Sequence, residues 1–152
     1  MKEIMPLLAR TDLAWSDRVA MLAYQLSQPS GEEIEVKHSF RSVWYIREMR
    51  IPADTYFIGR PHIEGHILKL LNGRAAMIYE GRPQVFVAPA VVYTKPEFQA
   101  VAYTYTDVLV QTWHLNPDNC RDLEALENSF FGPAEPVLAR GKELSQLQLE
   151  VA

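Results

Sequence analysis

The chain has 152 residues, of which 48% are hydrophobic and 22% are charged. This composition is typical of one soluble globular domain, and a chain of this length can bury a core without disulfides. Its single cysteine, Cys120, excludes an internal disulfide. A net charge of -4 with scattered basic residues argues against a nucleic-acid partner, and no apolar run approaches the roughly 20 residues of a transmembrane helix. We therefore expect a single domain, residues 1–152, in the cytoplasm of the cell that makes it, with no membrane partner.

The N-terminal part, residues 1–33, is predicted to be a helical arm. A helix is indicated from Ser16 onward, because apolar residues recur at helical spacing until the helix breakers Pro29 and Gly31. These apolar residues are Val19, Leu22, Ala23 and Leu26.

From residue 34 onward the pattern changes to short runs rich in β-branched and aromatic residues, which are typical of strands. The runs are 34–40, 43–51, 56–58, 66–71, 74–79, 85–88, 91–94, 99–105 and 108–114. Two of them flank Asn72-Gly73, a dipeptide that favours a type I′ hairpin, and residues 80–83 indicate a second hairpin. Because no helix-length segment separates the runs, residues 34–115 are predicted to form a mainly β fold, an antiparallel barrel or sandwich.

The C-terminal region, residues 116–152, is predicted to be a helix followed by a tail. Asn116 and Asp118 offer N-cap side chains before an apolar helical pattern, and Gly132-Pro133 ends it. The tail beyond carries only a few leucines in a polar setting, too few for a core of its own. We expect it to be either a docked helix or an arm that binds a partner.

Several short motifs occur in the order in which they are found in cupins. They are Ile51-Pro52-Ala53-Asp54-Thr55, Gly59-Arg60-Pro61-His62, His66, Leu70, Asn72-Gly73 and Pro89. With the segments 36–40 and 45–48, and a strand 107–114 followed by an acidic helix, the sequence resembles small cupin-like proteins of tailed bacteriophages. The resemblance covers residues 34–130 and implies a cupin-like β-barrel or jelly-roll sandwich.

The metal ligands of the cupin pattern are only partly present. In that pattern the first motif supplies two histidines two positions apart and then a glutamate, and the second motif supplies another histidine. Here Arg60 stands where the first histidine is expected, His66 stands where the glutamate is expected, and residues 96–101 contain no histidine. The resemblance therefore implies an eroded ligand set. We expect no cofactor, with a divalent zinc, iron or manganese ion as the alternative.

His62 and His66 are candidate metal ligands, because neutral imidazole is the commonest metal ligand among protein side chains. On a straight strand, residues four apart are separated by about 13 Å, so binding of one ion requires a bend, for which Pro61 and Gly65 are suited. His114 ends the strand 108–114 on its apolar face and is the candidate third ligand. The alternative is that hydrogen bonds satisfy these histidines, which then serve only the architecture.

Aromatic residues on the predicted strands are candidates for lining a ligand cavity, since such cavities are mostly apolar with a few polar groups. The candidates are Tyr79, Tyr103 and Tyr105, together with Tyr93 and Trp113. The simpler interpretation is that these aromatic residues form the core or cross-strand pairs. Arg47, Glu48 and Arg50 are expected to form cross-strand pairs on a solvated face.

Three functions remain open on the sequence. The first, which the phage resemblance and the eroded ligand set favour, is a non-enzymatic accessory protein in the host cytoplasm or on the virion, binding the virion or a host protein. The second is a metal-dependent small-molecule enzyme of dioxygenase or isomerase type, with His62, His66 and His114 holding the ion and Tyr103 or Glu64 assisting. The third is a small-ligand sensor. Edge strands need cover, so we also expect a homodimer or higher oligomer.

Overall fold

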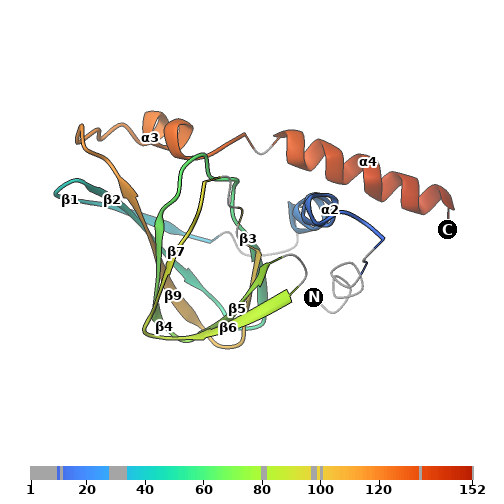
Figure 1. Ribbon diagram of the computed structural model, residues 1–152, viewed down its shortest axis with the longest axis horizontal. Coiled ribbons are helices and arrows are strands. Elements are labelled where there is room, and N and C mark those ends of the chain that lie inside the picture. Colours follow the sequence, from blue (N-terminus) through green and yellow to red (C-terminus); the bar gives the residue numbers. More distant parts are fainter. Residues whose placement is uncertain are drawn as a thin grey trace.

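The structure is a computed structural model that describes residues 10, 12–27, 34–79, 82–96, 99, 101–133 and 135–151. Within these residues two antiparallel sheets face each other, and helices lie outside them (Figure 1). The predicted mainly β, antiparallel sandwich is confirmed. The two sheets, however, are not closed into a barrel.

The strands are divided between the sheets in an order that differs from their order in the chain. The first sheet has the order β1-β2-β9-β4-β7, and the second has the order β3-β8-β5-β6. In the first sheet the bounds are β1 Val36–Arg41, β2 Trp44–Ile51, β9 Val108–Leu115, β4 Ile67–Asn72 and β7 Ala90–Tyr93. In the second they are β3 Thr55–Ile58, β8 Val101–Thr104, β5 Arg74–Tyr79 and β6 Arg82–Val87.

The register of the first sheet aligns its inward-facing side chains in rows. One row consists of Arg47, Thr112, Leu68 and Val92, and the next consists of Met49, Val110, Leu70 and Ala90. On the other side of the first row, Tyr45 lies opposite His114. The space between the sheets is therefore polar near His114 and becomes apolar along the strands.

Helix α2, Trp15–Ser27, is the predicted N-terminal helix and covers the outer face of the second sheet. Its apolar residues pack against strands β3, β5 and β8, because alternate residues of those strands point away from the first sheet. The buried members of this cluster are Val19, Met21, Leu22, Tyr56, Ile78 and Val101.

Helix α4, Glu135–Val151, packs against α2 and crosses it (Figure 1). Gly141 makes the close approach possible, because a Cβ atom at this position would lie 1.9 Å from the carbonyl oxygen of Ala20. Nearby, Arg140 Nε donates to Asp17 Oδ1 at 3.3 Å. The C-terminal tail is therefore a docked helix, the first of the two alternatives expected for it.

Helix α3, Leu123–Phe130, covers the polar end of the sandwich (Figure 1). Asp122 caps the helix, since its Oδ1 accepts the backbone N–H groups of Glu124 at 3.1 Å and Ala125 at 3.3 Å. The expectation that Asn116 or Asp118 caps it is wrong. The Asn116 side chain instead forms two hydrogen bonds with the backbone of Cys120. Its Nδ2 donates to the Cys120 carbonyl at 2.9 Å, and its Oδ1 accepts the Cys120 N–H at 3.1 Å.

The segment Asn72-Gly73 forms a turn between sheets, so the predicted hairpin at this position is wrong. Strand β4 pairs with β7 and β9, whereas β5 pairs with β6 and β8. Gly73 has a φ of 90°, and a Cβ atom on it would lie 2.2 Å from the carbonyl oxygen of Asp107. The second predicted hairpin is confirmed by the pairing of β5 with β6, although its turn, 80–81, lies outside the described residues.

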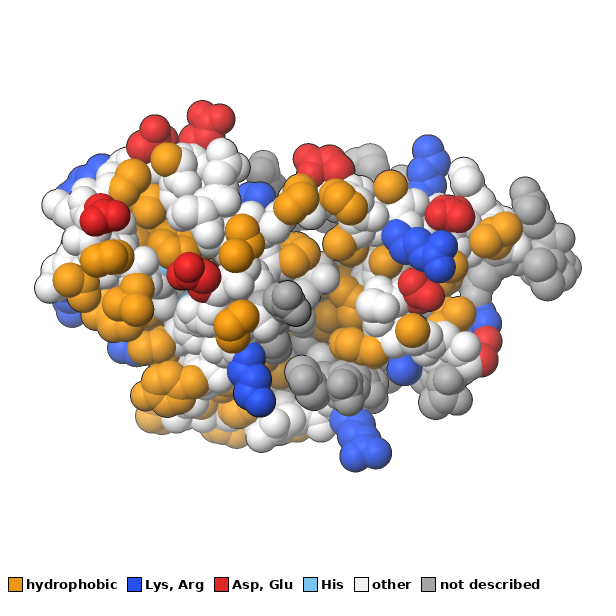
Figure 2. Space-filling view, turned by 45° about the horizontal axis from the view of Figure 1, so that its top comes forward, with side chains coloured by type: hydrophobic (Ala, Val, Ile, Leu, Met, Phe, Trp, Pro, Cys, Tyr) orange, Lys and Arg blue, Asp and Glu red, His pale blue; other side chains and the backbone are white. Residues whose placement is uncertain are grey.

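The surface carries no long basic stripe on the face shown in Figure 2, where Lys and Arg side chains alternate with acidic and hydrophobic ones. Apolar side chains are exposed on two edge strands, namely Val85 and Val87 on β6 and Val91 and Tyr93 on β7. None of the helices in the described part of the chain has the length and the apolar character that spanning a membrane requires.

Candidate metal centre and ligand cavity

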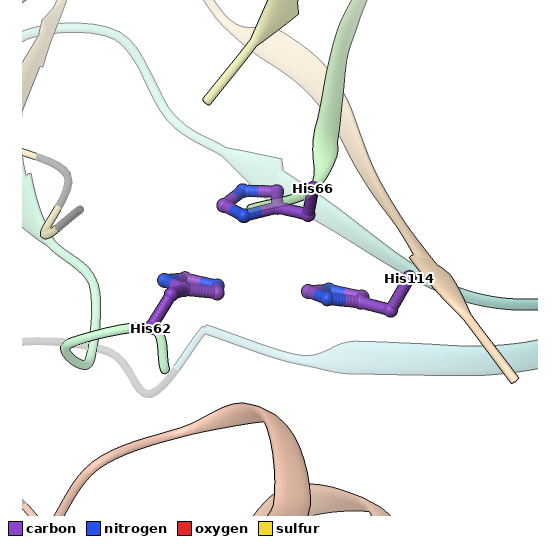
Figure 3. Close-up of side chains that lie close together, drawn as sticks. All are labelled: His62, His66 and His114. Carbon is purple, nitrogen blue, oxygen red and sulfur yellow. The ribbon is translucent and has the colours of Figure 1, made fainter. Parts of the chain in front are cut away.

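Three of the four histidines lie together at the polar end of the sandwich (Figure 3). His62 lies in the loop between β3 and β4, His66 directly precedes β4, and His114 lies in β9. All three are buried, and one ring nitrogen of each lies within 4.8 Å of those of the other two. The fourth, His38, lies on the edge strand β1, where its Nδ1 is 2.7 Å from the Tyr45 hydroxyl.

The chain bends sharply between His62 and His66, as binding of one ion by both requires. The bend is at residues 63 and 64, and it brings the two ring centroids to 4.0 Å. Gly65 is needed there, because a Cβ atom on it would lie 2.5 Å from the Thr94 carbonyl oxygen. On its other side this loop is held by α3, since the Ile63 N–H donates to the Phe130 carbonyl at 2.8 Å.

Thr94 orients the His66 ring through several contacts of its hydroxyl group. The Thr94 hydroxyl donates to the His66 carbonyl at 3.1 Å and accepts the His66 backbone N–H at 3.0 Å. The hydroxyl also lies 2.9 Å from His66 Nδ1, so this ring nitrogen is engaged in a hydrogen bond. Nε2 of His66 is therefore the ring nitrogen left for an ion.

Thr112 plays a similar part for His114. The two residues are on the same face of β9, and the Thr112 hydroxyl lies 2.9 Å from His114 Nε2. A hydrogen bond to the nitrogen that does not bind metal is the usual way in which a protein orients a metal-binding imidazole. In this arrangement Nδ1 of His114 is the nitrogen left for an ion.

Burial keeps two of these imidazoles neutral. It is the main cause that lowers the pKa of His66 to about 3, with smaller effects of His62 and Arg47. Burial likewise lowers the pKa of His114 to about 2, followed by the effects of His66 and His62. Both rings are therefore unprotonated at pH 7, the state in which imidazole can bind a metal ion.

Two arginines lie beside the histidines, and the sequence prediction assigned neither of them to a binding role. Their guanidinium carbons are 4.5 Å (Arg47) and 5.1 Å (Arg60) from the ring centroid of Phe131. The Phe131 ring also lies edge-on to His62, with the centroids 4.7 Å apart. The residue that follows α3 thus brings the arginines and histidines into one cluster.

The expectation that Arg47 lies on a solvated face is wrong. Strand β2 directs Arg47 inward together with Met49 and Ile51, which also line the space between the sheets. Glu48 does form the expected cross-strand pair, because its Oε1 accepts from Gln111 Nε2 at 2.8 Å. The alternation along β2 was the signal that could have identified Arg47, since it shares the face of two apolar residues.

A cavity of about 260 Å³ extends from the histidines between the two sheets. This is close to the lower end of the range of small-molecule pockets, about 300–1,000 Å³. Its polar lining residues are Arg47, Arg60, His62, His66, Thr104 and Thr112. The remaining lining is mostly aliphatic or aromatic and includes Met49, Ile51, Phe57, Leu70, Phe86 and Val110.

The aromatic residues proposed as cavity lining lie elsewhere. Tyr103 packs against Tyr56 beneath α2, with ring centroids 4.8 Å apart, and its hydroxyl donates to Asp54. Tyr105 is exposed, and the side chain of Tyr79 lies outside the described residues. The residues of strand β8 that line the cavity are instead Ala102 and Thr104.

Three other candidates also lie away from the cavity. Tyr93 is exposed on the edge strand β7, and Glu64 is exposed at the bend between the two histidines. Trp113 lies under the ammonium group of Lys69, which is 3.7 Å from the ring centroid. None of these side chains is placed to assist chemistry at the histidines.

The histidine cluster can hold a metal ion, and its donors fit a divalent transition metal. Two nitrogens bound to one zinc ion at about 2.0–2.1 Å are at most about 4.2 Å apart. The nitrogens here lie within 4.8 Å, so a small inward movement is enough. The rings of His62 and His66 stack with 23° between their planes, and one must rotate, because the lone pairs lie in the ring planes.

The sequence matches no protein-family model and no curated protein. Among solved structures, a protein with a double-stranded β-helix domain from Klebsiella pneumoniae subsp. pneumoniae MGH 78578 aligns with a TM-score of 0.50 and 12% identity, over 64% of this chain and 90% of that one. A cupin superfamily protein from Desulfitobacterium hafniense DCB-2 aligns with a TM-score of 0.49 and 10% identity, over 60% and 85% of the chains.

Salicylate 1,2-dioxygenase from Pseudoaminobacter salicylatoxidans aligns with a TM-score of 0.52 and 13% identity. The alignment covers 76% of this chain but only 34% of the dioxygenase. At such identities the likeness is one of fold. The chain thus has the double-stranded β-helix fold of cupins, and the fold expected from the sequence resemblance is confirmed.

Proposed function

We propose that this protein is a metal-dependent small-molecule enzyme in which His62, His66 and His114 hold one divalent ion. The observation that carries the proposal is the burial of three imidazoles with ring nitrogens within 4.8 Å at one end of a largely apolar cavity. Burying polar groups costs free energy unless they are satisfied, and a shared ion satisfies all three at once.

The number of protein ligands supports catalysis over a purely structural metal site. Structural zinc sites use four protein ligands, whereas catalytic sites use three and keep a position open for water or substrate. Among the described residues, the cluster of potential ligands contains these three histidines and no carboxylate or thiol. The open position would face the cavity, because His62 and His66 also line it.

The chain itself supplies orientation and exclusion of water. The hydroxyls of Thr94 and Thr112 hold the rings of His66 and His114, and the apolar walls keep bulk water away from a small ligand. A divalent ion, when bound, supplies Lewis acidity and, in the case of iron or manganese, redox chemistry.

Elemental analysis and thermal unfolding test the proposal. Protein purified without a chelator or a histidine tag should contain one zinc, iron or manganese ion per chain. Adding that metal to chelator-treated protein should raise the melting temperature by several degrees, because an ion that binds only the folded state stabilises it. The double variant His62→Ala, His66→Ala should abolish both the bound metal and the rise.

His38→Ala is the matched control, because it removes the one histidine that lies outside the cluster. It should leave metal content and the metal-induced rise in melting temperature unchanged. Absence of stoichiometric metal, combined with a melting temperature that responds to none of the three ions, would overturn the proposal.

The competing proposal is a non-enzymatic binding or structural role, in a phage virion or with a host protein. It is supported by Arg60, which stands where the cupin pattern places a ligand, and by the stacked rings of His62 and His66. On this proposal the double histidine variant loses about 1–3 kcal/mol of stability through packing and hydrogen bonds, and partner binding persists. A gene lying among virion genes would favour it.

A further inference from the structure

Two guanidinium groups at the polar end of the cavity have donors with no partner. Nε of Arg47 and Nε of Arg60 are both buried, and neither has a hydrogen-bond acceptor among the described residues. Both side chains line the cavity. A buried donor without an acceptor is unfavourable, and more so when the group is charged, so an acceptor that enters the cavity is strongly favoured.

The charges around these donors do not balance. Among the described residues, the acidic side chain paired with one of these arginines is Glu127, whose Oε2 lies 4.0 Å from Arg60 Nη1. The side chains of Arg60 and Glu127 are both partly exposed. Two cations and one anion leave one positive charge, which a single anionic group would compensate.

The shape and lining of the cavity define the rest of such a ligand. Past the row of Arg47 and Thr112, the inward-facing side chains are Met49, Val110, Leu70 and Ala90, all apolar. Phe57 and Phe86 close the opposite side. A small molecule with a charged group at one end and a compact apolar body fits a cavity that is polar at one end and apolar along the rest.

We propose that the cavity binds a small monocarboxylic acid, with its carboxylate on Arg47 and Arg60 and its apolar body between the sheets. Arginine suits this role, because its planar group donates two parallel hydrogen bonds to a carboxylate. The inference deepens the proposed function by naming the substrate class, but the arginine contacts do not require a bound metal.

Calorimetric titration with benzoate and hexanoate, each compared with its neutral amide, tests this inference. Each acid and each amide is titrated into chelator-treated protein and, separately, into protein loaded with zinc. Each carboxylate should bind the metal-free protein at least about tenfold more tightly than its amide, since only the carboxylate forms hydrogen bonds in which both partners are charged. The amide comparison in the unmodified protein does not depend on the folding of any variant.

Substitutions assign the effect to the two arginines. Arg47→Met and Arg60→Met keep the length of the side chain without its charge, and each should weaken carboxylate binding by about tenfold while leaving amide binding unchanged. Arg50→Met is the matched control, because Arg50 lies on the same strand but is exposed. Glu127→Gln should tighten carboxylate binding, because it removes the anion that competes for Arg60.

The outcomes separate this inference from the metal proposal. Carboxylate binding that persists in the double variant His62→Ala, His66→Ala supports the inference even when no metal is found. Equal affinity for carboxylate and amide overturns it, as does carboxylate binding that requires zinc and is insensitive to both arginine variants. Failure of both acids to bind in either metal state overturns it as well.

Discussion

At the scale of single residues, the site depends on two threonine hydroxyls. The Thr94 hydroxyl accepts the His66 backbone N–H, donates to its carbonyl and contacts Nδ1, so one hydroxyl leaves Nε2 as the ring nitrogen for an ion. Thr112 contacts His114 from two positions away on the same strand. Because both threonines are β-branched, their side chains have few rotamers, and they hold the rings at little cost in conformational entropy.

The lowered pKa values predict how the stability of the metal-free protein depends on pH. An imidazole in an unfolded chain titrates near pH 6.5, whereas His66 and His114 titrate near 3 and 2 in the folded protein. Between pH 6.5 and 3 the unfolded chain therefore binds protons that the folded protein does not. We expect the free energy of unfolding to fall as the pH falls, by about 2 kcal/mol per pH unit from these two residues together, averaged between pH 7 and pH 4.

Urea denaturation of metal-free protein at several pH values between 7 and 4 measures this slope. The double variant His66→Gln, His114→Gln should show a slope smaller by about 2 kcal/mol per pH unit, and His38→Gln serves as the control outside the cluster. An unchanged slope in the double variant would contradict the assignment of the low pKa values to these rings.

At the scale of elements, helix α4 is fixed by one close approach. Gly141 touches the backbone of α2, and a Cβ atom there would lie 1.9 Å from the Ala20 carbonyl oxygen. Alanine in place of glycine usually stabilises a helix by about 1 kcal/mol. We predict the opposite sign for Gly141→Ala, a loss of about 1–3 kcal/mol, because α4 must move away from α2.

Hydrogen exchange resolves the effect of Gly141→Ala along the chain. The amides of α4 should exchange faster, while those of β9 should keep their protection, since the substitution detaches one helix and spares the sandwich. Lys142→Ala is the control on the exposed side of the same helix and should change stability by less than about 0.5 kcal/mol. Slower exchange in α4 would show that the helices can be repacked.

The sequence predicted most strands because their residues alternate. Buried and less buried positions alternate along β9, and each side chain keeps its face whatever its partner strand is. The Asn72-Gly73 turn was misjudged for the opposite reason, since its partners are distant in the chain and local propensity cannot choose between them. Arg47 was misjudged because its charge was given more weight than its place in the alternation.

The candidate histidines could be named from the sequence, but their arrangement could not be derived. Their proximity depends on the pairing of β4 with β9 and on the contact of Gly65 with Thr94, both of which are tertiary features. Phe131 joins the cluster through the docking of α3, and nothing in its local sequence marks it. The inward direction of Arg47 follows from the alternation along β2, but its place beside Arg60 and Phe131 could not be predicted.

At the scale of the whole molecule, the open edges of the two sheets predict self-association. Val87 is 63% exposed on β6 and Tyr93 is 76% exposed on β7, and an exposed apolar edge strand is prone to pair with another chain. We predict a homodimer or higher oligomer at micromolar concentration. Light scattering coupled to size-exclusion chromatography measures the mass directly.

Lysine substitutions on these two edge strands should prevent self-association and leave the protein monomeric. Val87→Lys with Tyr93→Lys places one cation on each of the two exposed edge strands, whereas Val43→Lys places one in the turn between β1 and β2 and serves as the control. The double variant should be monomeric and folded, and the control should associate like the original protein. A monomeric mass for the unmodified chain would contradict this prediction.

The rows of inward-facing side chains in the first sheet also constrain how this protein can evolve. Insertion of one residue into β9 would turn Gln111 and Trp113 inward and Thr112 and His114 outward, because side chains alternate with a period of two. Fold and site would be lost in a single event. Point substitutions, by contrast, can change the rows one position at a time and so alter the preferred ligand, while changes in length are tolerated in exposed loops such as 117–119.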